Sequence, residues 1–160
     1  MVESLTEVPL HAATLRYFDA SGPFAAAVPS PGPLKATVMQ GGLVLAWLRP
    51  TETLALSEEA ALIAELSERL ARATGGHVVE LTGGLKALRL RGSRVAELLS
   101  RLGSAALGLR VGEARRGRFA DVPVLVVCVR AEEALLVVER AYGEHLRDWI
   151  QATLADWRQG

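Results

Sequence analysis

Residue types that could bind a metal or exchange a proton are sparse in this sequence and lie far apart. The histidines are His11, His77 and His145, and none has a cysteine, aspartate or glutamate at metal-ligand spacing. Zinc sites instead gather Cys and His ligands in closely spaced pairs. We therefore expect no metal site, and ordinary surface or half-buried roles for the histidines rather than that of a catalytic base.

Residues that could act as a nucleophile or hold a phosphate lack the required surroundings. Cys128 is the sole cysteine and stands among valines, which is typical of a small core residue. The glycine pairs at 41–42, 75–76 and 83–84 do not fit the phosphate-binding patterns G-x-G-x-x-G or G-x-x-x-x-G-K-[ST]. The sequence thus predicts no catalytic, cofactor-binding or metal-binding residue in this chain.

One cluster of like charges lies between Gly112 and Asp121. Arg115, Arg116 and Arg118 stand close together there, just before an apolar stretch. The planar guanidinium group suits carboxylates, with which it forms paired hydrogen bonds. We interpret the cluster as a contact for carboxylates of a partner chain or for an anionic ligand. A solvated connecting loop is the alternative.

Residues 1–33 differ from the rest of the chain in their high proline content. Pro29, Pro31 and Pro33 follow one another closely at the end of this segment. Proline fixes its own backbone and removes a hydrogen-bond donor. We predict an extended proline-rich arm over residues 1–33, with these three prolines at a partner interface. A disordered or merely surface-packed tail is the other interpretation.

In residues 34–160, turn residues and helix starts recur at regular intervals, which predicts a single α+β domain. Strands are expected at 34–40 and 43–49 around a glycine turn, and Ser57 can begin a helix that runs through residue 73. Further hairpins are expected at 77–91 and 122–139. Helices are expected from residue 93 and at the end of the chain.

The order of these elements indicates the fold. From residue 43 it runs strand, helix, strand, strand, helix, strand, which is the ferredoxin-like pattern. We predict one antiparallel sheet with helices on one face. In the last helix, Tyr142, Leu146, Trp149 and Ile150 recur on one face and are expected to pack against the sheet.

The charge and hydrophobicity of the chain limit the kinds of partner that it is expected to bind. Eighteen basic residues balance eighteen acidic ones, which argues against binding to nucleic acid or to an anionic membrane. The first residues have neither a basic start nor an apolar run, so no secretory signal is indicated and a cytoplasmic location is expected. A neutral, half-hydrophobic chain also favours partial coverage of its surface by another protein.

Four stretches, in order, resemble the gamma subunit family of heterotetrameric sarcosine oxidase, within the folate-binding aminomethyltransferase-like superfamily. They are an apolar strand followed by Pro-x-Glu-x-Leu, a strand and turn leading into a helix, an arginine-containing turn into a strand, and an Arg-x-Tyr helix start. In this sequence they lie at 44–54, 78–99, 118–125 and 137–149. Two positions depart from the family pattern, since Glu80 replaces a frequent aspartate and Ala141 a usual serine.

The resemblance implies a complex that oxidatively demethylates sarcosine or a related secondary amine, as part of one-carbon metabolism. In such a complex an alpha-like subunit holds NAD and tetrahydrofolate, a beta-like subunit holds FAD and FMN, and a delta-like subunit holds zinc. The gamma-like chain carries no cofactor. The resemblance therefore implies a non-catalytic structural or assembly subunit of an oxidoreductase complex.

Two other functions remain open from the sequence. A free-standing folate-binding one-carbon protein of the same superfamily would need a carboxylate aimed at a pterin, and Glu80 is the candidate. A small ligand-sensing domain is the second, because ferredoxin-like folds serve many tasks. That second function predicts a stable homodimer.

Overall fold

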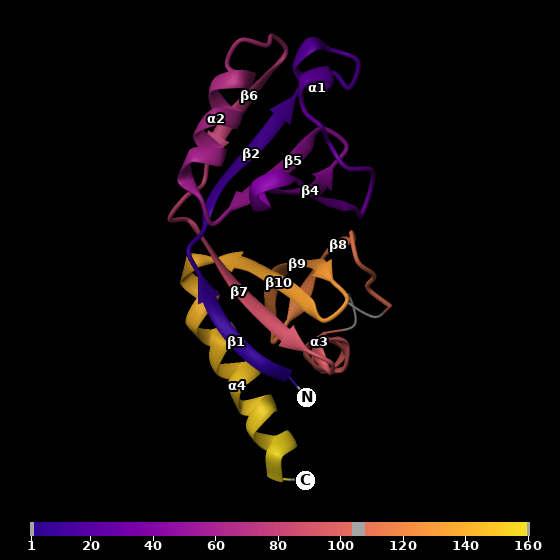
Figure 1. The fold of residues 1–160 in the computed structure, drawn as a ribbon, viewed down its shortest axis with the longest axis vertical. Helices are drawn as coiled ribbons and strands as arrows, with labels where there is room; N and C mark the ends of the chain where they lie inside the picture. The colour runs from indigo at the N-terminus through magenta and orange to yellow at the C-terminus, as the bar shows by residue number, and fades with distance from the viewer. Residues whose placement is uncertain (1, 104–107, 160) are drawn as a thin grey trace. The chain divides into compact units, whose positions relative to one another are not determined.

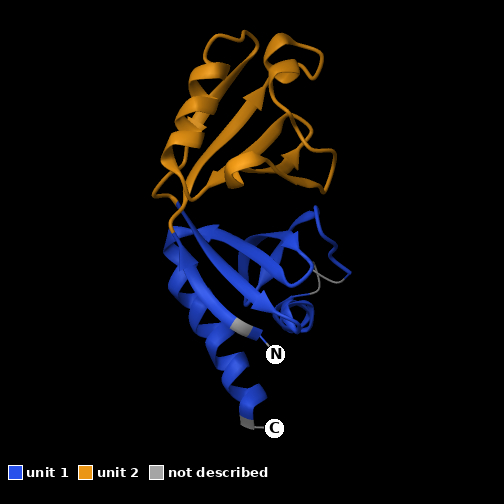
Figure 2. Ribbon diagram, viewed as in Figure 1, with its two compact units in different colours: residues 1–8, 85–160 blue, residues 9–84 orange. Residues whose placement is uncertain are grey.

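The computed structural model describes residues 2–103 and 108–159, which form two compact units (Figure 1). Unit 1 contains residues 1–8 and 85–160, and unit 2 contains residues 9–84 (Figure 2). Each unit is built on a five-stranded sheet whose neighbouring strands are all antiparallel. The predicted α+β class is therefore confirmed, but the single predicted sheet is two sheets.

The sheet of unit 2 has the strand order β3-β4-β5-β2-β6. Helix α2 begins shortly after Ser57, whose hydroxyl accepts a hydrogen bond from the Glu59 amide at 2.9 Å. The elements of this unit are β2 (His11–Tyr17), α1 (Pro23–Ala27), β3 (Ala36–Val38), the short 3-10 helix η1 (Gln40–Gly42), β4 (Val44–Arg49), β5 (Glu52–Ser57), α2 (Ala60–Leu70) and β6 (Gly76–Glu80).

The core of unit 2 forms where the apolar stripe of α2 meets the sheet. Ile63, Leu66 and Leu70 recur at helical spacing, and all three are buried in one cluster with Leu15 of β2. Phe24 of α1 belongs to the same core. A Cβ atom at residue 76 would lie 2.3 Å from the Phe24 ring, so this strand position requires glycine.

The sheet of unit 1 has the strand order β1-β7-β10-β9-β8. Its core combines Leu98 of α3 with Leu146 and Ile150 of α4, against inward-facing residues of the strands. The elements are β1 (Val2–Val8), β7 (Leu85–Gly92), α3 (Val95–Leu102), β8 (Ala114–Phe119), β9 (Val122–Arg130), β10 (Glu133–Glu139), the short 3-10 helix η3 (Arg140–Tyr142) and α4 (Gly143–Gln159).

The two units repeat one topology. In unit 2 the strands β2, β4, β5 and β6, with α1 and α2 between them, follow the ferredoxin-like order in which the fourth strand pairs with the first. Unit 1 repeats this order with β7, β9, β10 and, as its fourth strand, β1. Each unit also carries one added edge strand, β3 or β8, beside its second strand. Each unit taken alone is therefore ferredoxin-like.

The predicted extended arm over residues 1–33 is wrong, and so is the single domain over 34–160. β1 pairs with β7 in unit 1, and β2 lies between β5 and β6 in unit 2. Both strands contribute buried residues to the cores of their units, including Val2 of β1 and Leu15 of β2. Of the prolines in this segment, Pro9 lies between β1 and β2, Pro23 begins α1, and the prolines at 29, 31 and 33 lie in the loop before β3.

Two further expectations need correction. The stretch 77–91 is not a hairpin, because β6 belongs to the sheet of unit 2 and β7 to that of unit 1. On the last helix, Leu146 and Ile150 are fully buried, but Trp149 is 52% exposed and Tyr142 is also exposed. The packed stripe of α4 continues instead through the partly buried Leu154 and Trp157.

Candidate functional site

The three clustered arginines lie on β8, at an edge of the unit 1 sheet, and not in a loop. Arg116 and Arg118 are exposed, and Arg115 is half-buried beside Glu113, with 3.0 Å between guanidinium and carboxylate. Arg118 donates a hydrogen bond to the Asp121 carbonyl. The structure thus brings the three side chains onto one short strand, and their contact with a partner stays a prediction.

The turn after β8 is held in an unfavourable backbone conformation. Ala120 and Asp121 have φ values of 49° and 64°, a region that usually holds glycine or asparagine. The Ala120 amide donates to the Leu102 carbonyl at 3.1 Å, and His145 Nε2 donates to the Ala120 carbonyl at 3.0 Å. Contacts from α3 and α4 therefore fix this turn, which presents a rigid edge next to the arginines.

The three candidate prolines lie between α1 and β3 in unit 2. Pro29 and Pro33 are exposed, whereas Pro31 is buried. Ser30 is within 2.8 Å of the Thr53 hydroxyl, and Val28 belongs to the unit 2 core. This segment packs against its own unit, so only its exposed prolines are available to a partner.

Each unit holds one largely buried carboxylate between two arginines. In unit 2, Glu52 lies 3.2 Å from Arg16 and 3.0 Å from Arg49. We did not predict this triad from the sequence. Because its charges are paired and hydrogen-bonded, it holds strand ends together and offers no free acid or base.

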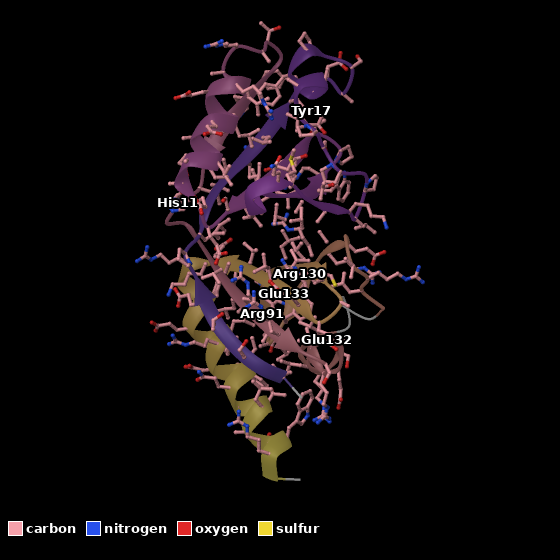
Figure 3. The ribbon with its side chains drawn as sticks, viewed as in Figure 1. His11, Tyr17, Arg91, Arg130, Glu132 and Glu133 are labelled. Carbon is pink, nitrogen blue, oxygen red and sulfur yellow. The ribbon has the colours of Figure 1, made fainter. Side chains whose placement is uncertain are left out.

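The corresponding triad in unit 1 is centred on Glu133, which lies 3.1 Å from Arg89 and 3.0 Å from Arg91. Figure 3 labels Glu133 and Arg91 of this triad. Glu133 is also the strand partner of Arg130, just as Glu52 is the partner of Arg49. Both hairpins therefore read Arg-x-x-Glu. This repeated spacing is the signal that could have revealed the duplicated topology and the Arg49–Glu52 pair of unit 2, whereas Glu133 takes both of its arginines from β7.

The cysteine and the other histidines are the remaining groups that could react. Burial, with the nearby Glu113 carboxylate, raises the pKa of the Cys128 thiol, which disfavours the nucleophilic thiolate. His77 stacks near Phe18 at 5.7 Å between ring centroids, and His11 starts β2. Within residues 2–103 and 108–159, no three His, Cys, Asp or Glu side chains are placed to hold a metal ion.

A cavity of about 480 Å³ opens between β6 and α2 in unit 2. Its lining includes Leu70, Ala71 and Ala73 from the helix and the turn after it, and Gly76, Val78 and Glu80 from the strand. Glu80 Oε1 accepts a hydrogen bond from the Thr82 amide at 3.0 Å. We call this feature the β6–α2 groove.

A smaller cavity of about 340 Å³ occupies the equivalent place in unit 1, between β1 and α4. Leu5 lines it from the strand, and Gln151, Leu154 and Arg158 line it from the helix. Nearby, the guanidinium groups of Arg94 and Arg101 stack on the Trp157 ring at 4.2 and 4.8 Å. Among the described helices of both units, none is long and apolar enough to span a membrane.

Comparisons with solved structures identify other proteins with the same fold. The chain is similar to the glycine cleavage system aminomethyltransferase T of Bartonella henselae (TM-score 0.67, 15% identity), with 91% of this chain and 44% of that chain covered. It is also similar to the regulatory subunit of aspartate kinase from Thermus thermophilus in its ligand-free form (TM-score 0.52, 10% identity, 95% and 98% covered). At these identities the likeness shows a shared fold.

A closer likeness is to a chain of the heterotetrameric sarcosine oxidase of Corynebacterium sp. U-96 in complex with pyrrole 2-carboxylate. The TM-score is 0.82 at 24% identity, with 96% of this chain and 84% of that chain covered. The model of the sarcosine oxidase gamma subunit family matches residues 17–156, and the chain belongs to that family. The resemblance stated from the sequence is thereby confirmed. No significant match was found among curated protein sequences.

Proposed function

We propose that this chain is a non-catalytic structural subunit of a heterotetrameric sarcosine oxidase-type complex. The observation that carries the proposal is the match of the gamma subunit family model to residues 17–156. The likeness to a chain of a heterotetrameric sarcosine oxidase over 96% of this chain supports it. The complex oxidatively demethylates sarcosine or a related secondary amine, and it works in the cytoplasm.

The structural role is supported by what the polar groups of the chain do. Glu52 and Glu133 are each held by two arginines, and His145 fixes the turn after β8. The pKa of Cys128 is raised, which keeps its thiol protonated and unreactive. These groups stabilise the two units, and the oxidative chemistry belongs to other subunits.

The partners are alpha-, beta- and delta-like subunits, which carry NAD, tetrahydrofolate, FAD, FMN and zinc. The exposed arginines of β8 supply one contact, because an edge strand with a fixed turn can present guanidinium groups to carboxylates of a partner. The exposed Pro29 and Pro33 supply a second contact from unit 2.

Co-expression with the other three subunits tests the proposal. A tagged copy of this chain should recover them in equal amounts with their flavin absorbance, and the isolated chain should show neither flavin nor amine oxidation. Stoichiometric flavin retained by the isolated chain, or failure to recover the other subunits, would contradict the proposal. Binding of tetrahydrofolate by the isolated chain, lost in Glu80→Gln, would instead support the free-standing folate protein.

The arginine contact has its own test. The double variant Arg116→Glu, Arg118→Glu should weaken recovery of the partner subunits. Both side chains are exposed, and reversing their charge makes them repel the carboxylates of a partner. Arg69→Glu, an exposed arginine of α2 outside the β8 cluster, is the matched control. Equal recovery with the double variant and the control would remove β8 from the interface.

A further inference from the structure

Among the residues that the structure describes, no strand pairs with the outer side of the edge strand β6. β6 is the last strand of its sheet and pairs with β2. The Leu81 amide donates to the Ala12 carbonyl at 2.8 Å, and the Phe18 amide donates to the Gly75 carbonyl at 2.9 Å. Since antiparallel pairs alternate, residues 75, 77, 79 and 81 face β2, and the backbone of residues 76, 78 and 80 faces outward.

The same outward-facing residues line a cavity. Gly76, Val78 and Glu80 form the strand side of the β6–α2 groove, and Leu70, Ala71 and Ala73 form its opposite wall. Its volume of about 480 Å³ falls in the range of roughly 300–1,000 Å³ that holds sizeable apolar ligands. A strand edge beside an apolar pocket is the arrangement that binds extended peptides, with backbone hydrogen bonds for affinity and the pocket for selectivity.

The other edges of the two sheets carry features that discourage added strands, and β6 does not. β3 has only three residues, β8 carries three arginines, and β1 has an irregular register between Val2 and Ser4. β6 pairs with β2 without interruption over residues 76–80 and contains no proline, lysine or arginine. An edge left open in this way marks a site for a partner.

The surroundings of the groove indicate what the partner offers. Glu80 stands at the last position of the strand and is exposed, so it favours a lysine or arginine on the added segment. Phe18, 76% exposed, lies against His77 and adds aromatic surface near the beginning of the same strand. Aromatic side chains, phenylalanine included, are enriched in the cores of protein interfaces.

We propose that the β6–α2 groove receives an extended segment of a partner subunit, which adds to β6 as a sixth strand. One apolar side chain of the segment fills the cavity against Leu70 and Ala71. A basic side chain of the segment pairs with Glu80. This inference rests on the proposed membership of a multi-subunit complex, and it adds to unit 2 a docking surface that does not include the arginines of β8.

Two variants block the groove by different means. Ala71→Arg places a long side chain in the cavity, and Ala64→Arg, an exposed alanine of α2 outside the cavity lining, is its matched control. Val78→Pro removes an outward amide while leaving the bonds to β2, because proline is tolerated where the N–H faces away from the sheet. Each groove variant should weaken recovery of the co-expressed subunits by roughly tenfold or more, about 1.4 kcal/mol. Ala64→Arg should not, and all three should keep the wild-type far-ultraviolet spectrum.

Hydrogen exchange supplies a readout that does not depend on folding of the variants. In the assembled complex, the amides of Gly76, Val78 and Glu80 should become protected relative to the isolated chain. Unchanged exchange there, or full assembly of Ala71→Arg, would overturn the inference. A wild-type homodimer broken by Ala71→Arg would show a second copy in the groove and would also overturn it. Failure of the wild-type chain to recover any subunit would refute the proposed function, and this inference with it.

Discussion

Unit 1 and unit 2 use the same strand order but close it differently. Unit 2 draws all its strands from the continuous stretch 9–84, whereas unit 1 takes its fourth strand, β1, from before unit 2 and the rest from after it. The helices also differ, since α4 has 17 residues and its counterpart α2 has 11. One architecture thus yields a unit closed by a distant segment and a unit closed by its own last strand.

The comparison separates the features that both units share from those that only one unit has. The Arg-x-x-Glu hairpin recurs in both units, and so does the cavity between the fourth strand and the second helix. The arginine-rich added strand is found in unit 1, whose cavity is the smaller one. Unit 2 has the larger cavity and the uninterrupted edge β6. The features found in both units stabilise each unit. The features found in only one unit are the candidates for contacts with partner subunits.

Deletion of the first strands of the two units should have the largest effect on stability. Removal of residues 1–30 takes away β1, β2 and α1 and should abolish cooperative unfolding, a loss of more than about 5 kcal/mol. Removal of residues 1–8 should unfold unit 1 and leave the strands and helices of unit 2 in place. Far-ultraviolet circular dichroism and hydrogen exchange measure both. A native spectrum after removal of residues 1–30 would contradict the assigned roles of β1 and β2.

Truncation of one core leucine in each unit should come next. Leu146→Ala in α4 and Leu70→Ala in α2 each remove a fully buried side chain, and each should cost about 2–5 kcal/mol in the free energy of unfolding. Trp149→Ala is the control and should change stability by less than about 0.5 kcal/mol, because its ring is exposed. Denaturant melts measure all three. A large loss for Trp149→Ala would show that its ring is packed.

The two carboxylate triads should differ in strength. Arg89 beside Glu133 has a side chain only 18% exposed, whereas both arginines beside Glu52 are more than half exposed. We expect Glu133→Gln to cost about 1.5–3 kcal/mol, and Glu52→Gln to cost less because solvent screens its partners. Thermal melts at low and high salt measure the difference. A larger loss of stability for Glu52→Gln would show that burial of the carboxylate matters more to the triad than exposure of its arginines.

The smallest effect concerns Cys128, which reports on unit 1 alone. Because burial raises the pKa of its thiol, labelling near pH 8 should be slower than for an unfolded chain. Leu146→Ala should accelerate labelling by destabilising unit 1, and Leu70→Ala should not. Equal acceleration by both variants would show that the two units open together.

The sequence predicted those parts of the fold that depend on local patterns. The apolar spacing of Ile63, Leu66 and Leu70 identified α2, and the two apolar runs around residues 131–132 identified the β9–β10 hairpin. The strands at 2–8 and 11–17 were missed, because β1 pairs with residues some 80 positions further along and the neighbouring prolines suggested an arm. Pairing over such distances leaves no local signal.

The candidate site was predictable only in part. The arginines of β8 were recognised as a cluster, but their charges and Gly117 hid the strand that carries them. On α4, helical spacing grouped Trp149 with Leu146 and Ile150, yet the face that meets the sheet is narrower than the apolar stripe. The β6–α2 groove depends on which backbone groups face outward, and that follows from strand register.

The order in which β1 and its partner occur in the chain has a consequence for biosynthesis. Residues 2–8 leave the ribosome before unit 2, but β7, with which they pair, follows only after all of unit 2. At about 5–20 residues per second, β1 waits on the order of ten seconds with both edges unpaired while unit 2 folds. An exposed strand of this kind is open to mispairing. Nascent chains halted before residue 85 should therefore require chaperone protection of residues 2–8, and chains extended past residue 139 should not.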